Sequence, residues 1–277
     1  MKFDPGNLEI VPVAAGGNSL RLKNSYETFH PVVGPEVEPR ILHVEQQKIV
    51  ERARASDDFI LWDVGFGAAA NAIAAIQVLK PENSKVTLHS FDLSLSPMQF
   101  AVDHADSLPY VQPFQEILKE LAEKKKVQIR EGFDWHFHEG DFRQTMYLAP
   151  APASIFYDPY SPSTNVDMWT LSHFEKLRKI LPSESPCLLT NYTRSSITRI
   201  TLLLAGFYVG VGVGVAKKEE TSIFSNTLSL LERPLDRKWL EKRVKISHSA
   251  APLREEYRIA PINEEDLAAL EAHPQFR

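Results

Sequence analysis

The sequence predicts an α/β fold with a mostly parallel sheet, followed late in the chain by an antiparallel hairpin. Residues 59–64 form a short, almost wholly apolar segment, which is the pattern of a strand buried on both faces. A glycine turn and a helical segment follow, and residues 86–91 form a second apolar segment ending at an acid, which completes a βαβ unit. Residues 207–215 and 222–230 alternate around a charged turn, as antiparallel hairpins do.

The other segments extend this pattern in both directions. Residues 1–40 are rich in Pro, Gly and Asn and predict a loop-rich lead-in with one hairpin, and 41–55 predict an amphipathic helix. Further helices are expected over 68–80, 97–106, 110–126, 167–180 and 195–205, and further strands over 127–130, 135–138, 153–157 and 187–192. We therefore divide the chain into a lead-in (1–56), an α/β domain (57–231) and a C-terminal tail (232–277) packed on that domain.

Composition and charge exclude several classes of protein. The 277 residues include 31 basic and 36 acidic side chains, so the net charge is −5 and a nucleic acid would have to meet a local patch. A single cysteine, Cys187, excludes an intramolecular disulfide and a thiolate zinc cage, and the histidines lack metal-ligand spacing. With no secretory signal pattern and no apolar stretch of about 20 residues, we expect a cytoplasmic protein without membrane segments or metal.

Gly65-Phe66-Gly67 stands where the first strand enters its helix. Glycine there permits positive φ angles and close ligand approach, beside the free N–H groups of a helix N-terminus. A tight turn without a ligand would show the same pattern, so the motif alone is weak. Asp92 ends the next strand, where an acid binds the ribose hydroxyls of either NAD or S-adenosylmethionine. Asp63 precedes the turn and favours the methyl donor, because it would hold the ammonium group of a methionine moiety, which NAD lacks.

Two later strand ends carry further candidates. Asp141 follows the strand at 135–138, where it would accept a hydrogen bond from an adenine amino group with Phe142 beside the ring. The same pair suits a helix N-cap and a core aromatic residue. Asp158 ends the strand at 153–157, and two prolines stiffen the loop after it. In an open α/β sheet the chemistry lies beyond the carboxyl ends of the strands, so this loop is placed to hold reactive groups.

The segment YDPYSPSTNVDMWT, residues 157–170, resembles the D-x-[FY]-[AS]-P-x-x-N-P-[DE]-[ML]-W-[ST] signature of the MnmC-type tRNA methyltransferase domain. The resemblance runs from about residue 20 to 231 and is most specific over 158–169. It includes the glycine loop, the lead-in and the late basic turn, with these residues in register: Asn71, Glu27, His30, Gly34, Glu38, Lys217 and Lys218. The chain departs from the family pattern at Ala69, Pro159 and Val166.

This resemblance implies a Rossmann-like class I methyltransferase that uses S-adenosyl-L-methionine. Members of the family methylate the exocyclic amine of 5-aminomethyluridine-type nucleosides, with or without a 2-thio group, at the wobble position of the tRNA anticodon. The product is the 5-methylaminomethyl form. Some members carry a fused flavin-dependent oxidase, whereas this chain resembles the methyltransferase-only form, so a separate enzyme would supply the aminomethyl group. Nothing in the sequence predicts an oligomeric state.

The same resemblance implies roles for individual residues. Asp158 would orient the amine and accept its proton. Tyr160 and Trp169 would stack on the uracil ring, although Trp169 also suits the core. Lys217 and Lys218 would contact the tRNA. The residues expected to hold the cofactor are Asp63, Gly65, Gly67, Asn71, Asp92, Asp141 and Phe142.

Three other functions remain open from the residues alone. A methyltransferase of the same fold would act on another RNA site or on a small amine, and product analysis would identify it. An NAD-dependent oxidoreductase would fit the relaxed glycine pattern at 65–70, and ligand titration would identify it. A non-catalytic protein that binds an adenosyl ligand would bind the donor without turnover.

Overall fold

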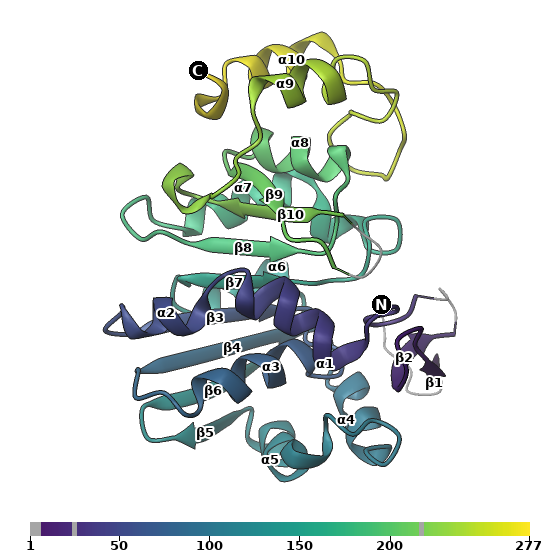
Figure 1. Cartoon of the computed structure of the whole chain (residues 1–277), viewed down its shortest axis with the longest axis vertical. Helices are drawn as coiled ribbons and strands as arrows, with labels where there is room; N and C mark the ends of the chain where they lie inside the picture. Colours follow the sequence, from purple (N-terminus) through teal and green to yellow (C-terminus); the bar gives the residue numbers. More distant parts are fainter. Residues whose placement is uncertain (1–6, 24–26, 216–218) are drawn as a thin grey trace.

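The computed structural model describes residues 7–23, 27–215 and 219–277. An eight-stranded sheet in the order β5-β6-β4-β3-β7-β8-β10-β9 runs through the molecule (Figure 1). Its five central strands are parallel: β6 (Phe133–Glu139), β4 (Val86–Asp92), β3 (Phe59–Val64), β7 (Ser154–Tyr157) and β8 (Leu188–Asn191). The mostly parallel sheet of the sequence prediction is confirmed.

Both edges of the sheet are antiparallel. Strand β10 (Thr221–Ser225) pairs antiparallel with β8 and with β9 (Tyr208–Gly212), so the predicted late hairpin is confirmed. At the opposite edge β5 (Lys126–Arg130) pairs antiparallel with β6, which the sequence did not predict. The connection from β5 to β6 is too short for a crossover, and Gly132 turns it at a φ of 73°.

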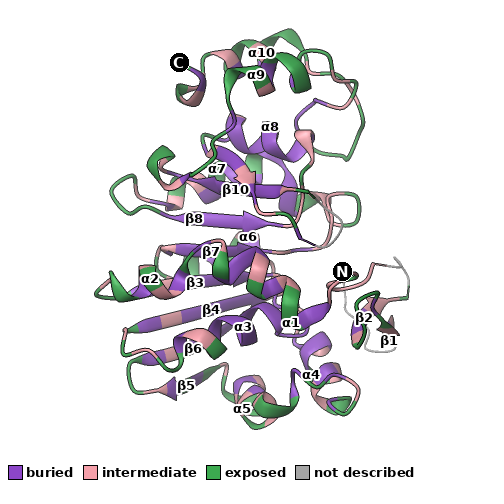
Figure 2. Cartoon of the chain, in the orientation of Figure 1, coloured by how far each residue is buried: buried purple, intermediate pink, exposed green. Residues whose placement is uncertain are grey.

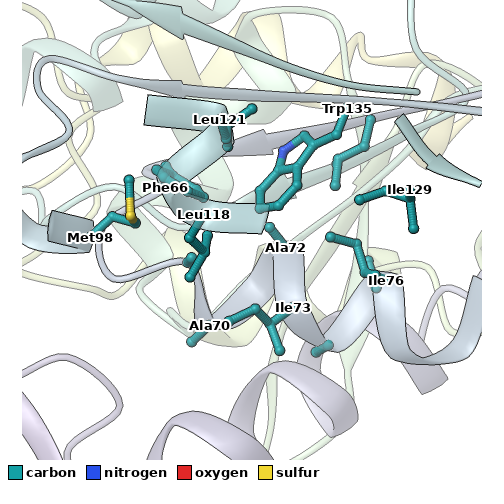
Figure 3. Packing of buried hydrophobic residues seen from close by; sticks show 14 of the residues in the cluster. Phe66, Ala70, Ala72, Ile73, Ile76, Met98, Leu118, Leu121, Ile129 and Trp135 are labelled. Carbon is teal, nitrogen blue, oxygen red and sulfur yellow. The ribbon is translucent and has the colours of Figure 1, made fainter. Parts of the chain in front are cut away.

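Two hydrophobic clusters cover the two faces of the sheet. The central strands and helices such as α3 (Ala70–Leu79) and α8 (Ser196–Leu204) are largely buried (Figure 2). The first cluster contains residues of α3, α4 (Ser96–Asp103) and α5 (Gln115–Lys124), with Phe66 and Trp135 among its larger side chains (Figure 3). The second cluster contains residues of α6 (Phe142–Thr145), α7 (Leu171–Ile180) and α8. Short 3-10 turns join these elements: η3 (Gln112–Phe114), η4 (Met146–Leu148), η5 (Val166–Trp169) and η6 (Leu228–Leu230).

The lead-in forms the predicted hairpin, but its helix differs from the prediction. Strands β1 (Leu8–Pro12) and β2 (Asn18–Leu22) pair antiparallel. Instead of one helix over 41–55, the chain forms α1 (Gly34–Pro39), a π-helix η2 (Arg40–Glu45) and α2 (Ile49–Arg54). The break falls at Lys48, whose φ is 51°, after two glutamines that are bound elsewhere: the Gln46 side chain accepts from Val213 N, and Gln47 donates to Thr190 and Ile155. Tertiary hydrogen bonds therefore override the helical pattern.

The C-terminal tail contributes to the second cluster instead of only lying over it. It contains α9 (Arg237–Trp239), the π-helix η7 (Leu240–Val244), α10 (Glu264–Glu271) and the 3-10 turn η8 (Pro274–Phe276). Leu240, Leu270 and Phe276 are buried members of that cluster. The Gln275 side chain binds the edge strand β9, because its Oε1 accepts from Val209 N at 2.8 Å and its Nε2 donates to Val209 O at 2.7 Å. Within the described ranges no helix has the length and apolar character needed to cross a membrane.

Candidate active site

The candidate site lies where the chain changes direction in the sheet. Strand β3 has β4 on one side and β7 on the other, so the loops that follow β3 and β7 leave the same edge in opposite directions, as at a topological switch point. These loops touch: a Cβ atom added to Gly65 would lie 2.5 Å from Asp158 O, and Gly65 has a φ of 89°. Glycine is therefore required at this position by the neighbouring loop as well as by the turn itself.

The glycine turn binds the next strand through its own backbone. The N–H groups of Gly65 and Phe66 both donate to Phe91 O at 3.1 Å, and Gly67 N donates to Asp92 Oδ2 at 2.8 Å. A pyrophosphate needs such N–H groups at a glycine turn, and here three of them already have acceptors in the protein. This turn therefore suits a ligand without phosphate better than a dinucleotide.

Asp92 is partly buried at the end of β4. Its Oδ2 accepts from Gly67 N, and its Oδ1 accepts from Leu93 N at 2.7 Å. Burial raises the pKa of Asp92 to about 6, and the backbone hydrogen bonds from Gly67, Leu93 and Ser94 oppose that shift. Each carboxylate oxygen can accept a second hydrogen bond, so Asp92 still has capacity for the ribose hydroxyls predicted from the sequence.

Asp63 lies one layer deeper, under the glycine turn. Its side chain has no exposed surface, and its Oδ2 accepts from the Ser90 hydroxyl at 3.0 Å, which in turn accepts from Trp135 Nε1. Burial raises the pKa of Asp63 to about 7. Its Oδ1 is buried, and no donor in the described residues meets it with hydrogen-bond geometry, although the nearby Asn71 side chain opposes the rise in the Asp63 pKa. A buried acceptor that lacks a donor fits a nearby ammonium group, which is the group that the sequence assigned to Asp63.

Asn71 stands on the first turn of α3 and connects the two loops. Its Nδ2 donates to Asp158 Oδ2 at 2.9 Å, and only 2% of its surface is exposed. The predicted catalytic residue Asp158 is also held by its backbone, since Asp158 N donates to Val64 O at 2.9 Å and extends the pairing of β7 with β3. The structure thus brings Asn71, Asp158 and Gly65 together.

Hydrogen bonds to three side chains hold the Asp158 loop, residues 158–165. Trp169 Nε1 donates to Tyr160 O at 2.8 Å, the Tyr192 hydroxyl donates to Pro159 O at 3.2 Å, and Ser161 N donates to Glu27 Oε1 at 2.7 Å. Trp169 belongs to the 3-10 turn η5 instead of the predicted helix and has no exposed surface, so it offers no face to a base in this structure. Its visible role is to position the loop.

The lead-in also covers the glycine turn. A Cβ atom added to Gly67 would lie 3.1 Å from Phe29 Cε2, and the rings of Phe29 and Tyr160 meet edge to face with centroids 5.6 Å apart. Phe29 N donates to Leu20 O at 2.8 Å, which ties this segment to β2. Sequence reasoning did not assign site roles to Phe29, Glu27 or Tyr192. The resemblance in the lead-in, with Glu27 in register, was the available signal.

Asp141 is a helix N-cap and Phe142 is a core aromatic residue, which are the two structural alternatives that the sequence left open for them. Asp141 caps α6 by accepting from Arg143 N at 2.9 Å, and the Arg143 guanidinium binds both carboxylate oxygens. This hydrogen bonding holds the pKa of Asp141 below its usual range. Phe142 is 5% exposed and packs against Trp62 and Phe91 in the second cluster. Neither residue touches the glycine turn or Asp158 through a contact seen in this structure.

The remaining residues to be placed are the two lysines of the late basic turn and the histidines. Lys217 and Lys218, which the sequence assigned to tRNA contact, lie outside the described residues. His89, His136 and His138 stack on one another along β4 and β6, and His89 Nδ1 lies 2.9 Å from His138 Nε2. No group of three or more His, Cys, Asp or Glu side chains in the described part of the chain has the geometry to hold a metal ion.

Comparison with known proteins gives three consistent matches. The profile of a family described as S-adenosyl-L-methionine-dependent methyltransferase matches residues 109–224, from before β5 to β10. The tRNA 5-methylaminomethyl-2-thiouridine biosynthesis bifunctional protein MnmC of Leptospira interrogans is 23% identical over 195 residues, which cover 66% of this chain and 30% of that protein. Its counterpart in Vibrio campbellii is 26% identical over 215 residues, which cover 69% of this chain and 31% of that protein.

A solved structure is similar over nearly the whole chain. MNMC2 from Aquifex aeolicus superposes with a TM-score of 0.72 at 25% sequence identity, and the match covers 95% of this chain and 82% of that one. The similarity therefore includes the lead-in and the tail, which lie outside the matched profile. This chain spans about a third of the length of the curated relatives it matches.

Proposed function

We propose that this chain is an S-adenosyl-L-methionine-dependent methyltransferase of the MnmC type, and that it methylates the exocyclic amine of 5-aminomethyluridine-type nucleosides at the wobble position of tRNA. The observation that carries the proposal is the position of Asp158. Asp158 lies at the switch point of the sheet, where its backbone carbonyl packs against Gly65 of the glycine turn and its carboxylate accepts a hydrogen bond from Asn71. A carboxylate there suits an amine acceptor next to the methyl donor.

The chemistry needs an amine nitrogen with a free electron pair. When bound, S-adenosylmethionine supplies an electrophilic methyl group on a sulfonium centre. An alkylamine is mostly protonated at neutral pH, so the enzyme must remove a proton before the nitrogen can attack. Asp158 accepts that proton and holds the amine in line with the methyl carbon, and placement of the two reactants supplies most of the rate enhancement.

Two features of the glycine turn support the sulfonium donor over a nicotinamide dinucleotide. Three N–H groups of the turn already donate to Phe91 O and Asp92 Oδ2, which leaves them unavailable to a pyrophosphate. Below the turn, Asp63 presents an acceptor without a donor in the described structure, which fits the ammonium of a methionine moiety. Asp63 and Asp92 would thus hold opposite ends of the donor.

A tRNA substrate accounts for the aromatic and acidic character of the Asp158 loop. The Tyr160 ring contacts the Phe29 ring edge to face, and an aromatic ring at that position suits stacking with an unstacked base of an anticodon loop. In this proposal a separate enzyme installs the aminomethyl group, and both enzymes act on cytoplasmic tRNA. The printed name of the curated relatives, biosynthesis of tRNA 5-methylaminomethyl-2-thiouridine, supports this substrate.

The test is methyl transfer to defined tRNAs. Purified protein is incubated with S-adenosylmethionine and tRNA that carries 5-aminomethyluridine or its 2-thio form, and the nucleosides are analysed by mass spectrometry. We expect the aminomethyl nucleoside to gain one methyl group, and tRNA with unmodified wobble uridine to gain none. Methylation at another nucleoside, or of the free nucleoside alone, would reject the tRNA wobble substrate in favour of another RNA site or a small amine.

Asp158→Asn tests the assigned role. The amide cannot accept the amine proton, so turnover should fall by about 10²–10⁴-fold. The affinity for S-adenosylhomocysteine, measured by calorimetry, should stay within about threefold, because Asp158 acts on the acceptor. A variant with normal turnover would remove Asp158 from the catalytic step.

A further inference from the structure

Asn71 occupies a position between two acids that belong to different strands. Its Nδ2 donates to Asp158 Oδ2 at 2.9 Å, and its side chain also faces the carboxyl group of Asp63. Asp158 follows β7 and Asp63 lies in β3, so one amide on α3 connects the ends of two neighbouring strands. Both acids only accept hydrogen bonds when charged, so it is the 2.9 Å hydrogen bond that assigns the NH₂ end of Asn71 to Asp158.

The helix around Asn71 allows it little freedom. The residues beside it, Ala70 and Ala72, are buried, and Asn71 itself is 2% exposed. Helix α3 begins immediately after Ala69, so the amide projects from the first turn, directly behind the glycine turn. A side chain that is buried on a rigid helix holds its partner more precisely than one on an exposed loop.

An amide donor has a specific effect on the carboxylate that it binds. A hydrogen bond to the charged form favours ionisation, so it keeps Asp158 ready to receive a proton. Donation to Oδ2 also restricts rotation of the carboxylate about its χ2 angle. An acid at position 71 would have the same shape and the opposite effect, because two carboxylates at hydrogen-bond distance cannot both remain charged.

We propose that Asn71 is a positioning residue for the catalytic carboxylate, acting through Asp158 and not through the cofactor. The proposal rests on the proposed function. In the supported step a protonated amine first gives one proton to Asp158. The nitrogen pair then forms the new N–C bond while the C–S bond breaks and its electrons return to sulfur, leaving a neutral thioether and a methylated, protonated amine. Asp158 finally releases its proton to water.

Two variants and one matched control test this assignment. Asn71→Asp keeps the shape and removes the donor, and Asn71→Ala removes the whole contact. Asn18→Asp is the control, because Asn18 Nδ2 also donates a partly buried hydrogen bond, to Ser107 O at 3.0 Å, which is not one of the site residues. Thermal unfolding establishes that each variant folds before kinetics are compared.

The expected signature is a change in pH dependence. In Asn71→Asp the acidic limb of kcat/KM should move up by about one pH unit or more, with kcat reduced about 10–100-fold at pH 7 and partly recovered at higher pH. Affinity for S-adenosylhomocysteine should stay within about threefold in both Asn71 variants, and Asn18→Asp should keep the wild-type pH profile. An unchanged pH profile together with a tenfold or greater loss of S-adenosylhomocysteine affinity would overturn the proposal and make Asn71 a cofactor ligand.

A substrate-independent measurement separates this proposal from the function on which it rests. Carbon-13 NMR titration of the aspartate carboxyl groups, with the Asp158 signal assigned from Asp158→Asn, reports the pKa of Asp158 directly. We expect that pKa to rise in Asn71→Ala and to rise further in Asn71→Asp; no change in either variant would overturn the positioning role. A wild-type protein that fails to methylate 5-aminomethyluridine tRNA would overturn the proposed function, while the titration would still decide the role of Asn71.

Discussion

The glycine turn after β3 and the Asp158 loop after β7 meet at the same edge of the sheet but are held in different ways. The turn is held by main-chain N–H groups, which donate to the last two residues of β4. The Asp158 loop is held by side chains: Glu27 in the lead-in and Tyr192 after β8 are distant in the sequence, and Trp169 lies in η5, directly after the loop. One loop is thus shaped mainly by its own N–H groups against an adjacent strand, and the other mainly by side chains, two of which are distant in the sequence.

This difference corresponds to the two substrates of the proposed reaction, because the glycine turn would bind the methyl donor and the Asp158 loop would bind the acceptor. A turn held by its backbone tolerates most side-chain changes and fails mainly where a Cβ atom cannot fit, which suits a constant cofactor. A loop held by separate side chains can be loosened one contact at a time, which suits an acceptor whose shape varies. Substitutions at matched positions in the two loops should therefore have different consequences.

The largest effect is expected from Gly65→Ala. The new Cβ would lie 2.5 Å from Asp158 O, and alanine at a φ of 89° is strained, so the free energy of unfolding should fall by about 4 kcal/mol. Gly16→Ala is the matched control: its φ is 94°, but nothing lies within 4 Å of the new atom, so only backbone strain of about 1–2 kcal/mol should appear. If urea denaturation gave equal losses of unfolding free energy for Gly65→Ala and Gly16→Ala, the glycine turn and the Asp158 loop would not be in close contact.

The second effect concerns the acid under the glycine turn. Burial raises the pKa of Asp63 to about 7, so the folded chain binds this proton more tightly than the unfolded chain does. The resulting stabilisation is complete below about pH 4 and is lost as the pH rises towards and through 7. Between pH 5 and 8 wild type should therefore lose about 3 kcal/mol relative to Asp63→Asn, measured by urea denaturation at each pH. If the unfolding free energies of wild type and Asp63→Asn changed in parallel with pH, the raised pKa of a buried Asp63 would be contradicted.

A third test applies one substitution to both loops. The Tyr192 hydroxyl donates to Pro159 O in the Asp158 loop, and the Tyr110 hydroxyl donates to Ala68 O beside the glycine turn. Replacing either tyrosine by Phe should cost about 1 kcal/mol of stability. Tyr192→Phe should reduce kcat about fivefold with unchanged S-adenosylhomocysteine affinity, and Tyr110→Phe should weaken that affinity with little change in kcat. The same kinetic defect in both variants would remove the distinction between the loops.

The smallest effect is expected at Ala69, where the family pattern has glycine. Ala69 has a φ of 67°, so Ala69→Gly should relieve backbone strain and stabilise the protein by about 0.5 kcal/mol after the entropy cost of glycine. Its methyl group has no exposed surface, so S-adenosylhomocysteine affinity should change less than twofold. Lys125→Gly, at a φ of 58° and outside the site, should give a similar gain in thermal stability. A large gain in affinity would show that the Ala69 methyl limits access of the donor.

Sequence reasoning reached the features that depend on local pattern. Apolar runs with an acid at the end locate strands and their carboxyl ends, so the parallel sheet, the glycine turn and the positions of Asp92 and Asp158 were predictable. The partners of these residues were not, because a hydrogen bond such as Tyr192 to Pro159 O or Ser161 N to Glu27 depends on tertiary packing. The split of the predicted helix at Lys48 has the same cause.

The assignment of side chains to ligand or structure was less predictable still. Asp141 stands at a strand end like Asp92, and only the structure shows that Arg143 takes both of its oxygens. Trp169 has the residue type of a base-stacking platform, yet its indole N–H binds Tyr160 O inside the core. Residue type and spacing limit what a side chain can do, and its neighbours decide which of those roles it takes.

The hydrogen bonds of the Gln275 amide to strand β9 bear on whether separate copies of the protein associate through the edges of their sheets. A strand at the border of a sheet offers unpaired donors and acceptors that can recruit the same strand of another molecule. Strand β9 reads YVGVG and carries no charge that would repel a second copy. At Val209 both backbone groups are already taken by Gln275. The segment 233–235 covers the same border, because Val211 N donates to Arg233 O at 2.8 Å and Leu235 N donates to Val209 O at 2.9 Å. Gln275 and this segment together protect the border from edge-to-edge aggregation.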